Sequence, residues 1–233
     1  MTIDWVFFDI GDVLFDENVP HLYHFHLMLL ALRRHGVDVS WDDYRMQIQQ
    51  SVRVRPDSAI DDAARHFVPD DALWNQIHQE VQEEYKTARK PHPYGLLLDN
   101  ITAVVQYLHT DFRLGIVANQ HPPILQALDA YGISHYFDVK AINEVIGLSK
   151  PDPAIFRWAL EQAGCPPERA LMIGDRPDND IAPARSLGMR TIRFQRGLLY
   201  TWYEPLQENE HADLIVRETL DLPRAVRRLA GGG

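Results

Sequence analysis

Two aspartates, a lysine and an asparagine stand where short apolar stretches of the chain give way to polar residues: Asp9, Asn119, Lys150 and Asp175. Carboxylate oxygens are the ligands that Mg²⁺ prefers, and a carboxylate can also act as a nucleophile. An ammonium group beside them would neutralise charge on a bound anion. Each residue alone has an ordinary explanation as a helix cap or a turn residue. Their joint occurrence in this order favours a chemical site.

Strands are needed to bring these residues together. The apolar runs at residues 3–8, 114–118 and 170–173 predict buried strands that end just before the two aspartates and the asparagine. Further strands are predicted at 138–142, 191–194 and 214–216, and helices at 101–108, 122–132, 154–163, 181–187 and 222–229. This alternation predicts an α/β fold with a doubly wound, mainly parallel sheet covered on both faces. Ligands bind beyond the carboxyl ends of the strands in such folds, where the four polar residues fall.

Residues 16–95 have a different character, with helical spacing of apolar residues and no clear buried strand. Two stripes at that spacing are Leu22, Phe25, Leu29 and Leu32, and Trp74, Ile77, Val81 and Tyr85. The segment 89–95, rich in proline and basic residues, is predicted to connect back to the sheet. The sequence therefore predicts a core of residues 1–15 and 96–233 that carries a helical cap, residues 16–95.

Four segments of the chain carry a resemblance to a known family. They are FFDIGDVL at 7–14, GIVAN at 115–119, GLSKPDP at 147–153 and IGDRPDND at 173–180. Together they resemble the four motifs of the haloacid dehalogenase-like hydrolase superfamily, and the resemblance extends over essentially the whole chain. A helical cap between the first and second motifs is the first cap type of that family, which agrees with the insertion at 16–95.

The resemblance implies roles for the motif residues. Asp9 would be the nucleophile that becomes transiently phosphorylated, and Lys150 the motif lysine that neutralises charge on the transferring group. A Mg²⁺ ion would be held by Asp9, the backbone carbonyl of Gly11 and Asp175. Asp180 would orient the metal shell or Lys150, with Asp178 as the alternative for that part.

Two positions depart from the family pattern. Gly11 stands where phosphatases of the family usually carry a second aspartate as general acid and base. We hypothesise that the next residue, Asp12, partly substitutes as a catalytic residue, although it is equally well explained as a turn residue. Ala118 stands where the family has a Ser or Thr hydroxyl donor, so backbone N–H groups around Ala118, Asn119 and Gln120, with His121 nearby, are the expected binding groups for the substrate phosphate.

Three functions remain open at this point. The first is a Mg²⁺-dependent phosphatase that hydrolyses a small phosphomonoester through an aspartyl-phosphate intermediate. The second is a dehalogenase-type hydrolase, which also uses an aspartate nucleophile and needs no general acid at Gly11. The third is a catalytically weakened member of the family that binds a phosphorylated ligand or a protein partner.

Composition narrows the class of partner. The net charge of −10 and the lack of a Lys/Arg run argue against nucleic acid, so the expected partner is a small phosphorylated metabolite. The longest apolar stretch, 22–32, is too short to cross a bilayer, so no membrane is expected. The chain has one cysteine, and its first residues do not show the basic segment followed by an apolar stretch that is typical of a secretory signal, so we expect a cytoplasmic protein. We also expect a monomer or a homodimer.

Overall fold

The computed structural model describes residues 2–56, 58–89, 95–199 and 202–231. The chain divides into two compact units. One comprises Met1–Asp16, Leu96–Tyr200 and Pro205–Gly233, and the other comprises Glu17–Gly95 and Thr201–Glu204. These boundaries lie within one residue of the predicted core and cap, except that the segment at 201–204 groups with the cap. Within the cap unit, Nη2 of Arg55 donates a hydrogen bond of 3.0 Å to the carbonyl of Glu204.

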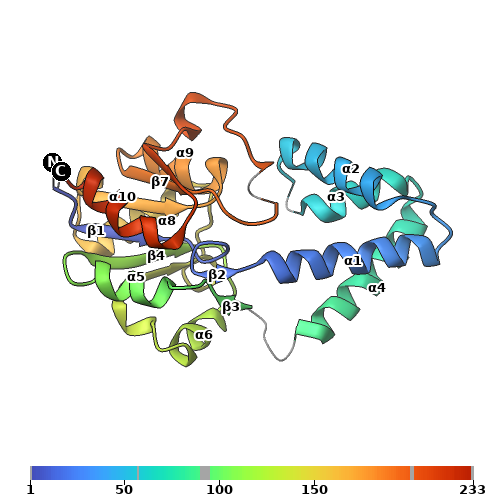
Figure 1. The fold of residues 1–233 in the computed structure, drawn as a ribbon, viewed down its shortest axis with the longest axis horizontal. Helices are drawn as coiled ribbons and strands as arrows, with labels where there is room; N and C mark the ends of the chain where they lie inside the picture. The colour runs from blue at the N-terminus through green and yellow to red at the C-terminus, as the bar shows by residue number, and fades with distance from the viewer. Residues whose placement is uncertain (1, 57, 90–94, 200–201, 232–233) are drawn as a thin grey trace. The chain divides into compact units, whose positions relative to one another are not determined.

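The core unit is built on a six-stranded sheet in the order β5-β4-β1-β6-β7-β8 (Figure 1). Its strands are β1 (Trp5–Phe8), β4 (Arg113–Ala118), β5 (Phe137–Ile142), β6 (Ala170–Gly174), β7 (Arg190–Phe194) and β8 (Leu214–Val216). All five pairings between these strands are parallel. Phe8 lies opposite both Ile116 and Ile173, so the carboxyl ends of β1, β4 and β6 meet at one edge of the sheet.

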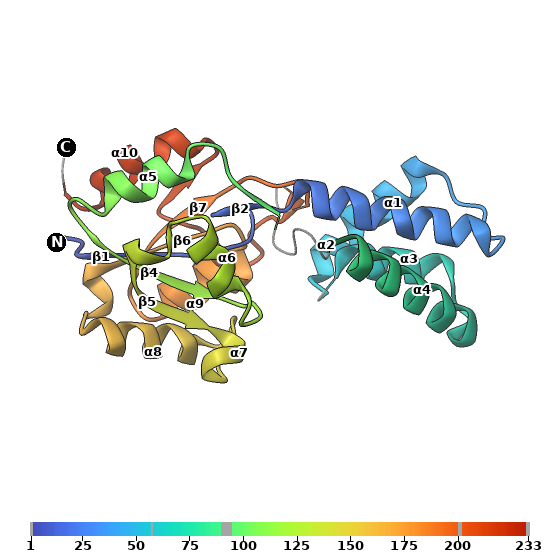
Figure 2. The same cartoon turned by 90° about the horizontal axis from the view of Figure 1, so that it is seen from below.

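Helices cover both faces of this sheet, as predicted (Figure 2). On one face, α8 (Pro153–Ala163) and α9 (Ala182–Ser186) share a buried apolar cluster with side chains of β1 and β6, among them Phe7 and Met172. On the other face, α5 (Ile101–Leu108) and α10 (Leu222–Leu229) lie together. The predicted ends of α8 are confirmed, because Asp152 accepts a hydrogen bond of 2.8 Å from the N–H of Ala154 and Gly164 ends the helix with φ +58°.

Several short elements were not predicted. β2 (Phe15–Asp16) and β3 (Leu96–Leu97) pair antiparallel where the chain leaves the core and returns to it. A π-helical turn, Pro177–Ile181, precedes α9, so that helix is shorter than the predicted 181–187. The predicted helix 122–132 is present as the shorter α6 (Ile124–Ala130), and other short elements in the described part of the core include α7 (Asn143–Ile146) and the 3₁₀ turns Ser134–Tyr136, Pro167–Arg169, Glu208–Glu210 and Thr219–Asp221. Two-residue strands and single turns carry no periodicity that a sequence pattern could show.

The cap unit is helical. Its elements are α1 (Asn18–Arg34), α2 (Trp41–Val54), α3 (Ala59–Phe67) and α4 (Asp71–Arg89). Ser40 and Ser58 begin α2 and α3 by accepting hydrogen bonds from the N–H groups three residues ahead. The predicted stripe on α1 is wrong at Leu22, which is 43% exposed, because the buried face of the helix begins further along and includes Met28. No helix in the described part of the chain is long and apolar enough to span a bilayer. The predicted connection at 89–95 lies largely outside the described residues.

Asp61 of α3 links the helices of the cap. Nε2 of His24 lies 3.1 Å from Oδ1 of Asp61, and Nε2 of His78 lies 3.7 Å from its Oδ2. Burial raises the pKa of the Asp61 carboxyl, but the hydrogen bonds and charges of His24, Ser58 and His78 outweigh it and the pKa is lowered. The carboxylate is therefore an anion that stabilises the folded cap.

Replacing Asp61 by asparagine should lower the free energy of unfolding by about 1–3 kcal/mol, because the buried imidazole of His24 loses its charged partner. Urea denaturation followed by circular dichroism measures this loss. A lowered pKa means that the contribution is present above the unfolded pKa of about 3.9 and is lost as the pH falls through the folded pKa. Asp62→Asn, on the exposed neighbouring residue, is the control and should cost less than about 0.5 kcal/mol. Equal losses in the two variants would contradict the prediction.

Candidate active site

Three carboxylates converge at the carboxyl edge of the sheet. Asp9 directly follows β1 and Asp175 directly follows the neighbouring strand β6, while Asp180 comes from the π-helical turn after it. One carboxylate oxygen of each lies within 4.8 Å of the others, a spacing that a single metal ion can bridge. Asp175 and Asp180 are buried, and Asp9 is half-buried. The predicted meeting of Asp9 and Asp175 on adjacent strand ends is thus present in the structure.

Lys150 lies between two of these carboxylates. Its Nζ is 2.7 Å from Oδ1 of Asp9 and 2.6 Å from Oδ1 of Asp180, and its side chain is almost fully buried. Burial lowers the pKa of the ammonium, but the charges of Asp180 and Asp9 and their hydrogen bonds raise it by a larger amount. The pKa of Lys150 therefore lies above its ordinary value. Lys150 thus remains protonated and places a buried positive charge beside Asp9.

The structure distinguishes the two aspartates proposed to support the site. Asp178 pairs with Arg176 through contacts of 3.2 and 2.7 Å. Asp180 instead binds Lys150 and accepts a hydrogen bond of 3.0 Å from the backbone N–H of Arg176. Its approach requires Gly174, because a Cβ added there would lie 2.3 Å from Cβ of Asp180. Of the two residues, Asp180 has the geometry expected of the one that orients Lys150.

Asn119 holds the backbone of the lysine loop. Its Nδ2 donates to the carbonyl of Lys150 at 2.9 Å, and its Oδ1 accepts from the N–H of Lys150 at 2.9 Å. This double hydrogen bond ties the end of β4 to a residue 31 positions further along the chain. Sequence reasoning assigned Asn119 to substrate binding and missed this positioning contact. The substrate-binding roles of Asn119 and of the buried Ala118 stay predictions.

The site carries more negative than positive charge. Burial raises the pKa of Asp175 well above its ordinary value, and repulsion from Asp180, Asp9 and Asp12 adds to this, while Lys150 opposes it. Three carboxylates around one point with a surplus of negative charge are what a hard divalent cation neutralises. The residues present therefore fit a Mg²⁺ ion. The buried guanidinium of Arg193 supports the cluster by donating a hydrogen bond of 3.2 Å from Nε to the carbonyl of Asp175.

The turn after β1 contains the two residues at which a general acid was sought. Gly11 is half-buried and has no side chain to donate a proton, and the predicted role of its carbonyl as a metal ligand stays a prediction. Asp12 has φ +49° and is fully buried. Its carboxylate packs against Gly197, where an added Cβ would lie 2.4 Å from Oδ2 of Asp12. This placement favours the turn interpretation of Asp12, and its role as a proton donor stays a prediction.

A comparison with known protein families identifies the family to which the chain belongs. The family model of the haloacid dehalogenase-like hydrolases matches residues 3–188. The chain belongs to this family. The matched span includes Asp9, Lys150, Asp175 and the whole helical segment between β2 and β3.

Relatives of this haloacid dehalogenase-like hydrolase include named phosphatases. A glyceraldehyde 3-phosphate phosphatase of Methanopyrus kandleri is 36% identical over 142 residues, which cover 60% of this chain and 58% of that enzyme. The match thus spans less than two thirds of that relative. A pyrimidine 5′-nucleotidase of Escherichia coli is 34% identical over 211 residues and covers 82% of this chain and 85% of its own. The crystal structure of a HAD-hydrolase from Bacillus subtilis bound to magnesium shares the fold, with a TM-score of 0.68, 18% identity and coverage of 97% and 99%.

A histidine and a glutamate at the same edge of this hydrolase form a pair that sequence reasoning did not find. Nδ1 of His121, just after β4, lies 2.6 Å from Oε1 of Glu144, just after β5. Beside them, the N–H of Gln120 donates a hydrogen bond of 2.6 Å to Oδ1 of Asn143. The signal was available, because applying the strand-end rule to the predicted strand 138–142 identifies residues 143 and 144 as site candidates.

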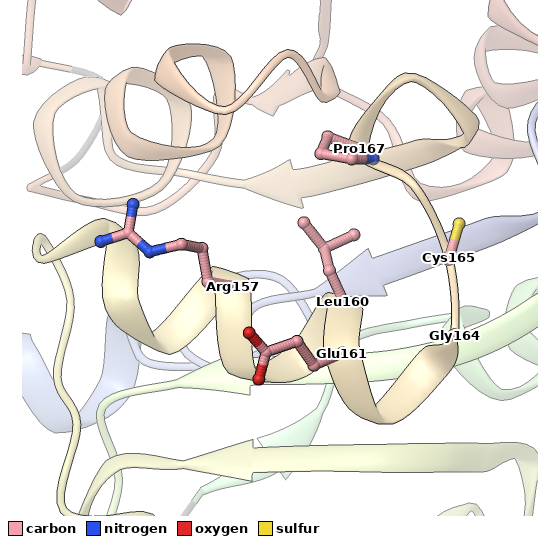
Figure 3. Close-up of a pocket in the computed structure, with 6 residues that line it drawn as sticks. All are labelled: Arg157, Leu160, Glu161, Gly164, Cys165 and Pro167. Atoms are coloured by element: carbon pink, nitrogen blue, oxygen red, sulfur yellow. The ribbon is translucent and has the colours of Figure 1, made fainter.

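A pocket of about 350 Å³ lies elsewhere on the hydrolase core (Figure 3). The end of α8 and the loop that follows line it, with Arg157, Leu160, Glu161, Gly164, Cys165 and Pro167. This loop leads into the amino end of β6, so the pocket lies at the edge of the sheet opposite to Asp9. Burial raises the pKa of the Cys165 thiol to about 11, which makes this cysteine a poor nucleophile at neutral pH.

Proposed function

We propose that the protein is a Mg²⁺-dependent phosphatase that hydrolyses a small phosphomonoester through an aspartyl-phosphate on Asp9. The observation that carries this proposal is the buried Lys150, which binds Asp9 at 2.7 Å beside the carboxylates of Asp175 and Asp180. A cation of this kind keeps the nucleophile ionised and screens the charge of an approaching phosphate. Family membership and phosphatase-named relatives support the same reaction class.

Each residue of the site has a separate role in the proposed reaction. Lys150 occupies Oδ1 of Asp9, and we assign the attack on phosphorus to the other carboxylate oxygen. The bond between phosphorus and the ester oxygen breaks as the bond to Asp9 forms. Water then attacks phosphorus, the bond to Asp9 breaks, and inorganic phosphate leaves. Asp180 holds the ammonium of Lys150 in place through both steps. Asp9, Asp175 and the carbonyl of Gly11 would hold Mg²⁺, which when bound neutralises charge on the phosphate oxygens.

The relatives differ in substrate, so the proposal names a class and not a compound. One relative is named for glyceraldehyde 3-phosphate and another for pyrimidine 5′-nucleotides, and both substrates are small phosphomonoesters. A dehalogenase would also use an aspartate nucleophile, but it has no need of the cluster of Asp175 and Asp180 beside Asp9. That cluster favours the phosphatase.

The test is phosphate release from a panel of small phosphomonoesters, measured with Mg²⁺ and again with excess EDTA. We expect turnover with the metal and its loss with the chelator, and a hydroxylamine-sensitive phosphoryl label on the peptide that contains Asp9. Measurable Mg²⁺ binding without turnover of any ester would favour a binding protein. Metal-independent halide release from a 2-haloacid would favour a dehalogenase.

A further inference from the structure

We propose that His121, oriented by Glu144, donates the proton to the leaving group of the substrate. The inference rests on the proposed phosphatase function and adds to it a proton donor outside the turn after β1. An alkoxide is a poor leaving group, and a positioned proton donor is worth about 10²–10⁴-fold in rate. Gly11 has no side chain for this purpose, and the carboxylate of Asp12 is fully buried against Gly197.

Two hydrogen-bonded links hold the loop of His121 in place on the edge that carries Asp9. Asn119 is bound through both atoms of its amide to the backbone of Lys150, whose Nζ contacts Asp9. The next residue, Gln120, donates its N–H to Asn143 at the end of β5. These contacts with Lys150 and Asn143 fix the start of the loop, and His121 follows directly.

The pairing of His121 with Glu144 suits proton donation. A carboxylate 2.6 Å from Nδ1 fixes the orientation of the ring and leaves Nε2 on the side of the ring away from Glu144. The side chain of His121 is 72% exposed and that of Glu144 is 45% exposed. A pair so exposed contributes at most about 1 kcal/mol to the free energy of unfolding, so its contribution to stability does not explain why the two side chains are paired. Exposure also leaves the ring accessible to a substrate that enters from solvent.

Another charged pair on this edge is less suited to the task. Arg176 keeps its protons at any ordinary pH, and its guanidinium holds both carboxylate oxygens of Asp178. An imidazole can both give and take a proton during one turnover, which a guanidinium cannot.

The proposed step balances as follows. As an oxygen of Asp9 forms its bond to phosphorus, the bond from phosphorus to the ester oxygen breaks, and the Nε2 proton of His121 moves to that oxygen to release an alcohol. The neutral imidazole then accepts a proton from the water that attacks the aspartyl-phosphate. Inorganic phosphate leaves, and the imidazolium is restored.

The experiment compares two substrates that differ in their need for a proton. The p-nitrophenolate of p-nitrophenyl phosphate leaves without one, whereas the alkoxide of the best alkyl ester from the panel does not. We expect His121→Gln to lower kcat/KM about 10²-fold or more for the alkyl ester and to leave the p-nitrophenyl ester within about threefold of wild type. Glu144→Gln should show the same selectivity with a smaller loss. His211→Gln, on an exposed histidine of the core unit, is the control and should change neither ester.

The outcomes separate this inference from the phosphatase proposal. Wild-type turnover of both esters with equal losses in His121→Gln, or with no loss, overturns the proton-donor role and leaves the phosphatase proposal standing. Turnover of the p-nitrophenyl ester but of no alkyl ester by the wild type also overturns it, because no donor then operates. Turnover of neither ester overturns both proposals. Mg²⁺ binding by calorimetry and the thermal unfolding midpoint should be unchanged in His121→Gln, which excludes a general loss of structure.

Discussion

Replacing Asp9 by asparagine should reduce phosphate release by about 10⁴-fold or more, the scale of loss seen when a catalytic nucleophile is removed. The amide is nearly isosteric with the carboxylate, but it lacks the charge and the nucleophilic oxygen that attack on phosphorus requires. It also removes the anion that Lys150 binds at 2.7 Å. The hydroxylamine-sensitive label should vanish from the peptide that contains residue 9. Initial rates with Mg²⁺ and mass analysis of the quenched enzyme measure the two effects.

Asp4→Asn is the matched control, because it makes the same chemical change beyond the opposite end of β1. Asp4 pairs with Arg169 on the surface of the core, remote from the carboxylate cluster. Its substitution should leave turnover close to wild type. If Asp9→Asn kept more than about one per cent of the activity, another group would have to be the nucleophile and the proposed function would fail.

Replacing Lys150 by methionine should have the second large effect, on stability and turnover together. The ammonium is buried between Asp9 and Asp180, and removing one partner of a buried ion pair costs about 3–5 kcal/mol. The remaining carboxylates, Asp175 among them, would then repel one another without compensation. Turnover should fall by about 10²–10³-fold or more, because the charge that stabilises the transferring phosphoryl group is gone.

Urea denaturation in EDTA measures the stability of this variant, and the same titration with Mg²⁺ shows whether the metal compensates. We expect Mg²⁺ to restore part of the lost stability, since it would neutralise the same carboxylates. Lys140→Met is the control, because Lys140 is a half-buried lysine of β5 whose Nζ donates a hydrogen bond of 2.7 Å to the carbonyl of Phe137 and lies outside the carboxylate cluster. It should cost about 1 kcal/mol. If Lys150→Met and Lys140→Met lowered the free energy of unfolding by similar amounts, the prediction that Lys150 stabilises the buried carboxylates would be contradicted.

Much of the fold followed from the sequence alone. Apolar runs ending in a polar residue placed β1, β4 and β6 to within a few residues, and the predicted helix 154–163 placed α8 to within one residue. These signals are local, because burial on both faces makes a strand apolar throughout and helix ends need particular residue types. The order of the motif segments was sufficient to identify the family before any geometry was known.

The tertiary structure decided which candidates meet. Residues 178 and 180 are both aspartates, so residue type does not distinguish them. Only the close approach of Asp180 to Gly174 and its hydrogen bond from Nζ of Lys150 assign Asp180 to the site. Asn119 was expected at the substrate, and the structure shows in addition that it holds the loop of Lys150.

The same holds for the proton donor. The carboxylate of Asp12 can be buried where it is because Gly197, which is remote in the sequence, leaves room for it. The pairing of His121 with Glu144 depends on the parallel register of β4 and β5. Sequence patterns report the burial and local conformation of single segments. The direction of a side chain beyond a strand end is set by hydrogen bonds and packing between segments far apart in the chain, which only the folded protein contains.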